Sequence, residues 1–282
     1  MARLDKVIKK RNMGLELKKA KAHKAAKPKK RSETTSILVI ILAMILLGAA
    51  LVWVVWSITG GGTPQTPSSC FDFDSKNGVI KKFKPGAKKC GTDINIPDKI
   101  DGASVITIAP NAFIRADITG VIIPDSVKAI QPRAFAENKL ESVQFGRNVE
   151  TIGNGAFKNN QITSVVLPPR LKVVSTEVFA SNQINDLQFG AAIEMINPSA
   201  FSNNKLSTLT IPDSVIYIRR SAFANNQLED LKVGSKVKMI DALAFKNNPL
   251  KNIKIEGDTS RFDKQWERIG FPASLKSEKA EK

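Results

Sequence analysis

Few residues of this 282-residue chain are of the types that carry out chemistry. Its single histidine, His23, lies in a lysine-rich stretch, where a solvated side chain is a simpler explanation than a catalytic one. The sequence contains no G-x-S-x-G motif, P-loop or zinc signature, and nothing marks a pair of carboxylates as general acid and base. We therefore predict a protein that is not an enzyme and that binds no cofactor or metal.

The two cysteines, Cys70 and Cys90, could form a disulfide, remain as free thiols, or supply half of a metal site. A metal site needs further ligands, and no histidine and no third cysteine follows residue 58. We favour the disulfide because the membrane topology predicted from residues 1–69 places both cysteines in an oxidising compartment. In the chain-entropy model, closing a loop of this size stabilises a fold by about 3 kcal/mol.

Residues of one type also recur at a constant 22-residue interval, which is the strongest pattern in the sequence. Phenylalanine occupies Phe113, Phe135, Phe157, Phe179, Phe201, Phe223 and Phe245. From the second turn onward, asparagine follows three residues later, at Asn138, Asn160, Asn182, Asn204, Asn226 and Asn248. An amide can satisfy backbone groups at a bend. Because the alternative role of asparagine in turns is structural too, we assign these residues to a structural ladder and not to a binding site.

Apolar residues eight and ten positions after each phenylalanine predict the element that repeats. Val121 and Ile123 are one such pair, and side chains two apart in a strand point to the same side. Each turn should therefore form a short strand that pairs in parallel with the next turn and buries a shared core. Eleven residues after the phenylalanine, proline and glycine alternate, so the underlying unit is a pair of turns. The predicted fold is a solenoid of 22-residue turns.

The phrase "IPDSV" at 123–127 returns at 211–215, followed each time by isoleucine and the Ala-Phe pair. This pattern resembles the BspA-like leucine-rich repeat family of bacterial surface proteins, and the resemblance covers residues 70–255. It implies a leucine-rich-repeat-like fold and a role in adhesion or in binding molecules on host or neighbouring cells. It implies no catalytic residues.

Residues 37–58 form a continuous apolar run without charge. As a helix rising about 1.5 Å per residue, this run spans about 33 Å, enough to cross a hydrocarbon core of roughly 30 Å. The run is longer than the apolar region of a cleaved signal peptide, and no convincing cleavage site follows it. A buried core helix would be shorter and less uniformly apolar. We predict an uncleaved, single transmembrane helix at 37–58.

The charge on either side of this run predicts its orientation. Residues 1–36 hold 13 basic and 3 acidic side chains, whereas the segment 59–69, read as a flexible linker, has no charge. The positive-inside rule places the N-terminus in the cytoplasm and the repeats outside the cell membrane. The basic tail either sets only this topology or also binds anionic lipid headgroups, at about 1 kcal/mol per basic residue.

Both ends of a solenoid must be closed. We expect an N-terminal cap and a longer first repeat over 70–112, regular repeats over 113–257, a cap helix over 258–272 and a disordered tail over 273–282. In the cap, Phe262, Trp266 and Ile269 have helical spacing, with Ser260 as the N-cap and Gly270 as the stop. Trp266 could instead stack on a ligand, but we favour its burial in the cap.

The outward strand positions, seven and nine residues after each phenylalanine, are the candidate binding face. Their side chains differ from turn to turn, as a recognition surface requires, although a solvated face would allow the same variation. They lack the aromatic and arginine anchors of tight interfaces. The selected residues are Ser142, Gln144, Asp186, Gln188, Thr208, Thr210, Asp230 and Lys232.

The leading hypothesis is a membrane-tethered binding or adhesion module for a protein, glycan or envelope polymer outside the cell. The alternative is a structural stalk without a specific ligand, held to anionic envelope polymer by charge. Nucleic acid is not an expected partner, because no basic stripe interleaved with aromatic residues is visible.

Overall fold

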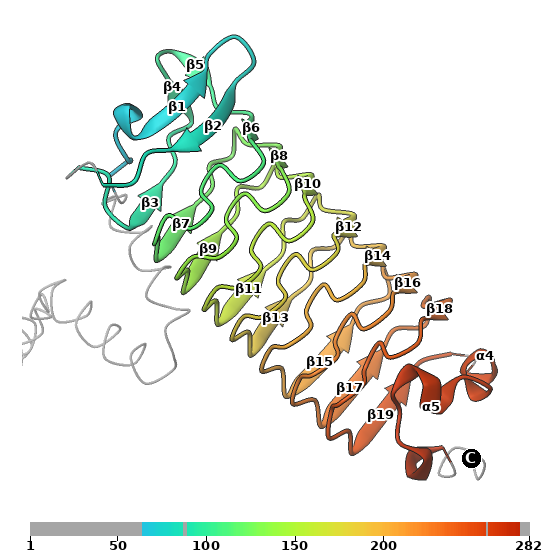
Figure 1. The fold of residues 1–282 in the computed structure, drawn as a ribbon. Coiled ribbons are helices and arrows are strands. Elements are labelled where there is room, and N and C mark those ends of the chain that lie inside the picture. Colours follow the sequence, from blue (N-terminus) through green and yellow to red (C-terminus); the bar gives the residue numbers. More distant parts are fainter. Residues whose placement is uncertain (1–63, 87–88, 258, 277–282) are drawn as a thin grey trace, which may run out of the picture. The chain divides into compact units, whose positions relative to one another are not determined.

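The computed structural model describes residues 64–86, 89–257 and 259–276. These residues form a stack of turns, and the same strand recurs in each turn to make a ladder of parallel strands (Figure 1). The strands of this first ladder are β3 (Asp93–Asn95), β7 (Gly120–Ile122), β9 (Ser142–Gln144), β11 (Ser164–Val166), β13 (Asp186–Gln188), β15 (Thr208–Ile211), β17 (Asp230–Val233) and β19 (Asn252–Ile255). Paired residues are offset by one turn of the repeat, as in the pairing of Leu209 with Leu231. The solenoid with a 22-residue period is therefore confirmed.

A second parallel ladder runs along the other side of the turns, and the sequence analysis did not predict it. Most of its strands have only two residues, with one side chain inward, so they produce no visible alternation. The strands are β6 (Thr107–Ile108), β8 (Ala129–Ile130), β10 (Thr151–Ile152), β12 (Val173–Val174), β14 (Met195–Ile196), β16 (Tyr217–Ile218) and β18 (Met239–Ile240).

The phenylalanine column forms the centre of the core. All seven rings are buried, and neighbouring rings from Phe113 to Phe245 stack with centroids 4.7 to 5.6 Å apart. Such offset contacts stabilise beyond the area they bury, by about 0.5–1.5 kcal/mol per pair. The stack thus gives each turn an apolar contact on both of its sides.

The asparagine column satisfies the backbone where the chain bends. Asn182 donates from its amide nitrogen to the carbonyls of Phe157 and Phe179, at 3.0 and 3.1 Å, and its amide oxygen accepts from the N–H of Ile162 at 3.1 Å. One side chain therefore bonds its own turn and the preceding one. The other asparagines of the column repeat these contacts.

The alternation of proline and glycine has a steric cause. A Cβ atom on Gly146 would lie 2.3 Å from the carbonyl oxygen of Pro124 in the preceding turn, and one on Gly190 would lie 2.4 Å from that of Pro168. A side chain is excluded at these positions because the backbones approach so closely. This contact makes a pair of turns the repeating unit.

The N-terminal end is closed by a hairpin and a disulfide. The short 3₁₀ helix η2 (Ser68–Cys70) leads into β1 (Phe71–Asp74), which pairs antiparallel with β2 (Val79–Phe83), and β2 then pairs in parallel with β6. Cys70 and Cys90 form a disulfide with their Cα atoms 5.7 Å apart, and both are buried.

Two details of this end differ from the expectation. The linker expected over 59–69 already contains a folded residue, since Thr66 is buried and its N–H donates to the carbonyl of Asn95 at 2.8 Å. The longer first turn contains an antiparallel hairpin of β4 (Lys99–Ile100) and β5 (Ala103–Ser104), joined by Asp101 and Gly102 at positive φ. Asp-Gly is a favoured pair for such a two-residue turn.

The C-terminal cap is divided where one helix was expected. It consists of α4 (Ser260–Asp263), α5 (Trp266–Ile269) and the 3₁₀ helix η3 (Ala273–Leu275). Thr259 takes the N-cap position of α4, so the assignment of Ser260 was wrong. Gly270 ends α5 in the left-handed conformation, at φ 105°. Trp266 is 2% exposed and donates to the carbonyl of Pro272 at 2.9 Å, which is the geometry of a cap residue.

The predicted transmembrane helix at 37–58, the tail at 1–36 and most of the linker lie outside the described residues. Within the described part of the chain, no helix is long and apolar enough to cross a membrane.

Replacing Asn182 by Ala should lower the free energy of unfolding by about 1–3 kcal/mol, because it leaves buried backbone groups without partners. Denaturant unfolding of the full chain would measure this loss. Gln227→Ala, at an exposed bend position, is the control and should change stability by less than about 0.5 kcal/mol. Equal effects of the two substitutions would contradict the role given to the asparagine ladder.

Replacing both cysteines by Ser should lower the free energy of unfolding by about 3 kcal/mol, since the unfolded chain regains the entropy of the open loop. Thermal unfolding with and without a reducing agent would measure this effect. Reductant should destabilise the wild type and leave the Cys70→Ser/Cys90→Ser variant unchanged. A wild type that is indifferent to reductant would argue against the bond.

Candidate functional site

The eight residues chosen as a binding face are all exposed in the structure, on one side of the first ladder. They occupy β9, β13, β15 and β17, and the inward residue between each outward pair packs against the core. Because each strand pairs with its neighbour without a shift of register, outward positions of paired strands form straight columns. Such columns can present side chains at the regular spacing of a sheet.

Hydrogen bonding divides this face into three sheets: β3-β7-β9, β11-β13 and β15-β17-β19. The ladder is interrupted after β9 and after β13. In both turns the residue ten positions after the core phenylalanine is itself a phenylalanine, Phe145 in one and Phe189 in the other. These rings are half-buried and meet the core rings edge-on, Phe145 against Phe157 at 5.4 Å. Smaller Val233 occupies the same place in β17, and there the ladder continues into β19. We attribute the interruptions to the size of these two rings.

Contacts between turns engage some of the outward residues. Asp230 accepts a hydrogen bond from Asn252 at 2.7 Å, and Asp186 accepts one from Ser164 at 3.1 Å. Lys232 forms an ion pair with Glu256 at 3.0 Å. Among the described residues, Gln144 and Gln188 make no side-chain hydrogen bond, so their amides are available to a ligand.

An open hollow of about 740 Å³ lies at the C-terminal end of this face. It contains four of the chosen residues, Thr208, Thr210, Asp230 and Lys232. The other lining residues had not been selected: Leu209, Leu231, Lys251, Asn252, Ile253, Lys254, Ile255, Gly257, Thr259 and Leu275. Asn252 and Lys254 continue the outward columns by one more turn, so periodicity could have added them. Leu275 could not be found this way, because it belongs to the irregular cap.

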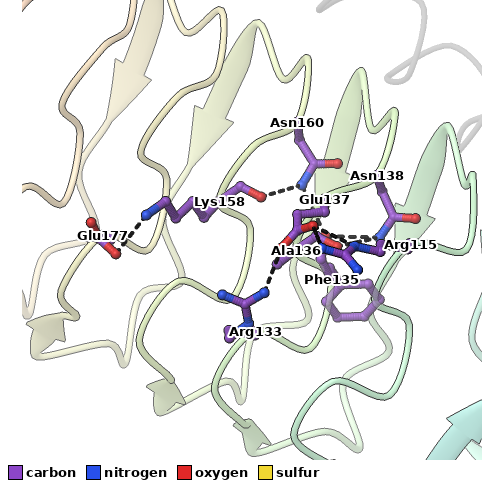
Figure 2. A network of polar contacts seen from close by, with 9 residues as sticks. All are labelled: Arg115, Arg133, Phe135, Ala136, Glu137, Asn138, Lys158, Asn160 and Glu177. Atoms are coloured by element: carbon purple, nitrogen blue, oxygen red, sulfur yellow. Dashed lines mark hydrogen bonds and ion pairs between the residues drawn. The ribbon is translucent and has the colours of Figure 1, made fainter.

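Charged residues outside the strand face pair between neighbouring turns. Figure 2 shows Glu137 between Arg115 of the preceding turn and Arg133 of its own turn, with Lys158 reaching Glu177 of the following one. The pKa of Glu137 lies below its ordinary value of 4.5, chiefly because the side chain of Arg115 donates a hydrogen bond to it. The positive charges of Arg115 and Arg133 and the hydrogen bond from Arg133 act in the same direction. These exposed pairs add little stability individually, because water and salt screen them.

Asp125 and Arg147 make a similar pair one turn apart. The Arg147 side chain donates to Asp125 at 2.7 and 3.0 Å, and its backbone N–H donates at 2.7 Å. These hydrogen bonds lower the pKa of the Asp125 carboxyl. Within the described residues, no three His, Cys, Asp or Glu side chains gather as metal ligands would. The arrangement offers polar and charged groups for binding and no constellation for acid–base or nucleophilic chemistry.

Comparison with known proteins agrees with this architecture. A family model described as the BspA type leucine rich repeat region matches six copies over residues 106–229 and 181–266, which is more than half of the chain. This chain belongs to the BspA-type leucine-rich repeat family. The family consists of bacterial surface proteins, and the leucine-rich repeat solenoid generally serves as a non-enzymatic scaffold for interactions. No curated protein sequence matched the chain.

The structure is similar to several solved leucine-rich repeat structures. The leucine-rich repeat protein of T. pallidum is 23% identical, with a TM-score of 0.50 over 61% of this chain and 85% of that one. The pneumococcal vaccine antigen PcpA is 24% identical, with a TM-score of 0.48 over 56% of this chain and 45% of that one. A leucine-rich cell surface protein from Faecalibacterium prausnitzii is 15% identical, with a TM-score of 0.39 over 76% of this chain and 100% of that one.

Acid should weaken this leucine-rich repeat domain through Glu137. A carboxyl with a lowered pKa contributes stability above its unfolded pKa and loses that contribution as pH falls through the folded value. The wild type should therefore lose more stability than Glu137→Gln as pH is lowered from neutrality to below 4.5. Urea unfolding across this pH range would measure the difference, and added salt should reduce it. Parallel pH profiles of the two proteins would contradict the prediction.

Proposed function

We propose that this chain is a membrane-anchored binding or adhesion module that recognises a surface protein, glycan or envelope polymer outside the cell. The observation that best supports this proposal is a difference between the inward-facing and the outward-facing columns of the first ladder. Inward positions repeat apolar residues, whereas exposed outward positions change from Ser142 and Gln144 to Asp230 and Lys232. A uniform scaffold with a variable face suits recognition, and membership of a surface-protein family supports the same role.

The anchor rests on the sequence of residues 37–58. In this proposal the helix crosses the cell membrane once, the tail at 1–36 lies in the cytoplasm near anionic lipid headgroups, and the repeats lie outside. The disulfide between Cys70 and Cys90 is consistent with an oxidising exterior.

A structural stalk is the second candidate, favoured by one observation. Several exposed charges pair between turns, as Arg115 does with Glu137 and Lys251 with Glu229, so part of the surface charge serves the stack itself. In that case attachment to anionic envelope polymer would depend on the remaining basic excess alone. Salt would then abolish it, because the screening length is only about 8 Å at physiological ionic strength.

Titration of the full-length protein against intact cells and isolated envelope, at low and physiological salt, separates the two candidates. Recognition through the strand face predicts saturable binding that survives salt. Replacing Gln144, Gln188 and Lys232 together by Ala should weaken it by roughly ten- to a hundredfold, the effect of losing about three hydrogen bonds.

A matched control replaces Gln161, Gln227 and Lys238 by Ala, which removes the same side-chain types from exposed positions outside that face. The control protein should bind as the wild type does. Binding that vanishes with salt, or that both triple variants weaken equally, would refute recognition through the strand face and leave the stalk.

A further inference from the structure

Within the part of the chain that the structure describes, the last strand of the first ladder, β19, has backbone hydrogen-bonding groups without partners. Towards β17, the N–H of Asn252 donates to the carbonyl of Glu229 at 3.0 Å, and that of Glu256 donates to Val233 at 2.9 Å. Alternate residues of a parallel strand bond to opposite sides. The N–H groups of Ile253 and Ile255 therefore point away from β17, and among the described residues none accepts a hydrogen bond from them.

Other parts of the two ends are covered by neighbouring segments, in contrast to this edge of β19. At the N-terminal end, Thr66 covers β3: its N–H donates to the carbonyl of Asn95, and its hydroxyl accepts from the N–H of Asn95 at 3.0 Å. At the C-terminal end, the bend after β18 is covered by α5, because the N–H of Phe245 donates to the carbonyl of Ile269 at 3.0 Å. Free strand edges attract other strands, and proteins usually protect them.

Space for another strand lies beside this edge. The hollow of about 740 Å³ is lined by Ile253 and Ile255 of β19 on one side, and by Gly257, Thr259 and Leu275 of the following cap segment on another. Its volume falls within the range of roughly 300–1,000 Å³ that is typical of ligand sites. Figure 1 shows β19 as the last strand of the ladder, next to the cap.

The register of the ladder specifies which side chains an added strand should carry. In the added strand, aliphatic residues would lie beside Ile253 and Ile255, just as these two lie beside Leu231 and Val233 of β17. Lys254 is exposed and forms no ion pair in the described part of the chain, so the residue beside it should be acidic. Neighbouring turns already pair opposite charges at equivalent positions, as Lys139 does with Asp117 at 2.8 Å.

We propose that the free edge of β19 binds an extended segment of a partner protein as an added parallel strand, and that this segment alternates aliphatic residues with a carboxylate placed beside Lys254. Backbone hydrogen bonds would supply affinity and the alternate side chains specificity, as in other cases of strand addition. This site combines the backbone edge of β19 with Lys254, so it does not require Gln144 or Gln188 of the outward face.

A labelled peptide with the core Thr-Val-Glu-Val tests this proposal against the full-length protein by fluorescence anisotropy. In the expected register, the N–H of its Glu donates to the carbonyl of Ile253, whereas the N–H of the second Val points away from β19. N-methylation of Glu should weaken binding by about tenfold or more, because it removes one hydrogen bond and blocks close approach. N-methylation of the second Val is the matched control and should be tolerated.

Protein variants test the side-chain part of the proposal. Lys254→Ala should weaken binding by about two- to fivefold, the effect of one exposed ion pair. Lys254→Glu should reverse the preference, binding a peptide with Lys in place of Glu better than the original. Lys238→Ala, at the exposed position that precedes β18 of the second ladder, should leave binding unchanged. Gln144→Ala and Gln188→Ala should also leave it unchanged, which separates this site from the outward face.

Three results would overturn the proposal. The first is equal loss of affinity for both N-methylated peptides, since this would exclude a strand in the expected register. The second is a scrambled peptide of the same composition that binds as well as the alternating one. The third is dimerisation of the protein in sedimentation experiments that the peptide inhibits, since this would identify a second copy as the occupant of the edge.

Discussion

The amide of each ladder asparagine joins backbone groups of two successive turns, and the rest of the solenoid depends on this contact. Every turn bends away from its strand next to the phenylalanine column, where backbone groups would otherwise be buried without partners. Asn182 satisfies two carbonyls and one N–H at this point. Because two of these groups belong to the preceding turn, the same side chain also fixes the spacing and register of the stack. The phenylalanine rings, the aliphatic columns and the strands are aligned as a result.

Exact repetition has a second effect, on charge. When turns stack in register, a side chain meets the equivalent side chain of the neighbouring turn, so a column of identical charges would repel itself. The chain places opposite charges at such offsets, as in Asp125 with Arg147 and Lys139 with Asp117. These pairs reduce repulsion more than they add stability, because exposed ion pairs contribute little. These pairs also occupy charges that would otherwise be available to a partner. Among the described residues of the strand face, Gln144, Gln188 and Lys254 form no such pair, so their polar groups are available for binding.

The sequence predicted the regular part of the fold because that part is repeated. The Phe113–Phe245 column, the asparagine column and the first strand ladder each follow from a period that several turns repeat. Features that occur once were missed or misplaced, such as the cover that Thr66 gives to β3 and the division of the cap between Asp263 and Trp266. The two-residue strands of the second ladder repeat but have too short a pattern to be visible. For the candidate site, the outward columns were predictable, whereas the hollow beside Leu275 depends on how the cap packs.

The contact between Pro124 and Gly146 bears on how such a protein can change its length. A side chain at Gly146 or Gly190 would clash with the preceding turn, so the neighbouring contacts stay intact when a segment is added or deleted as a whole pair of turns. Duplication of one such pair would meet this condition and lengthen the stack by about 9–10 Å, twice the spacing of adjacent strands. Both caps would meet the same neighbours as before. The length of the solenoid could therefore evolve in steps of one pair of turns, without remodelling either end.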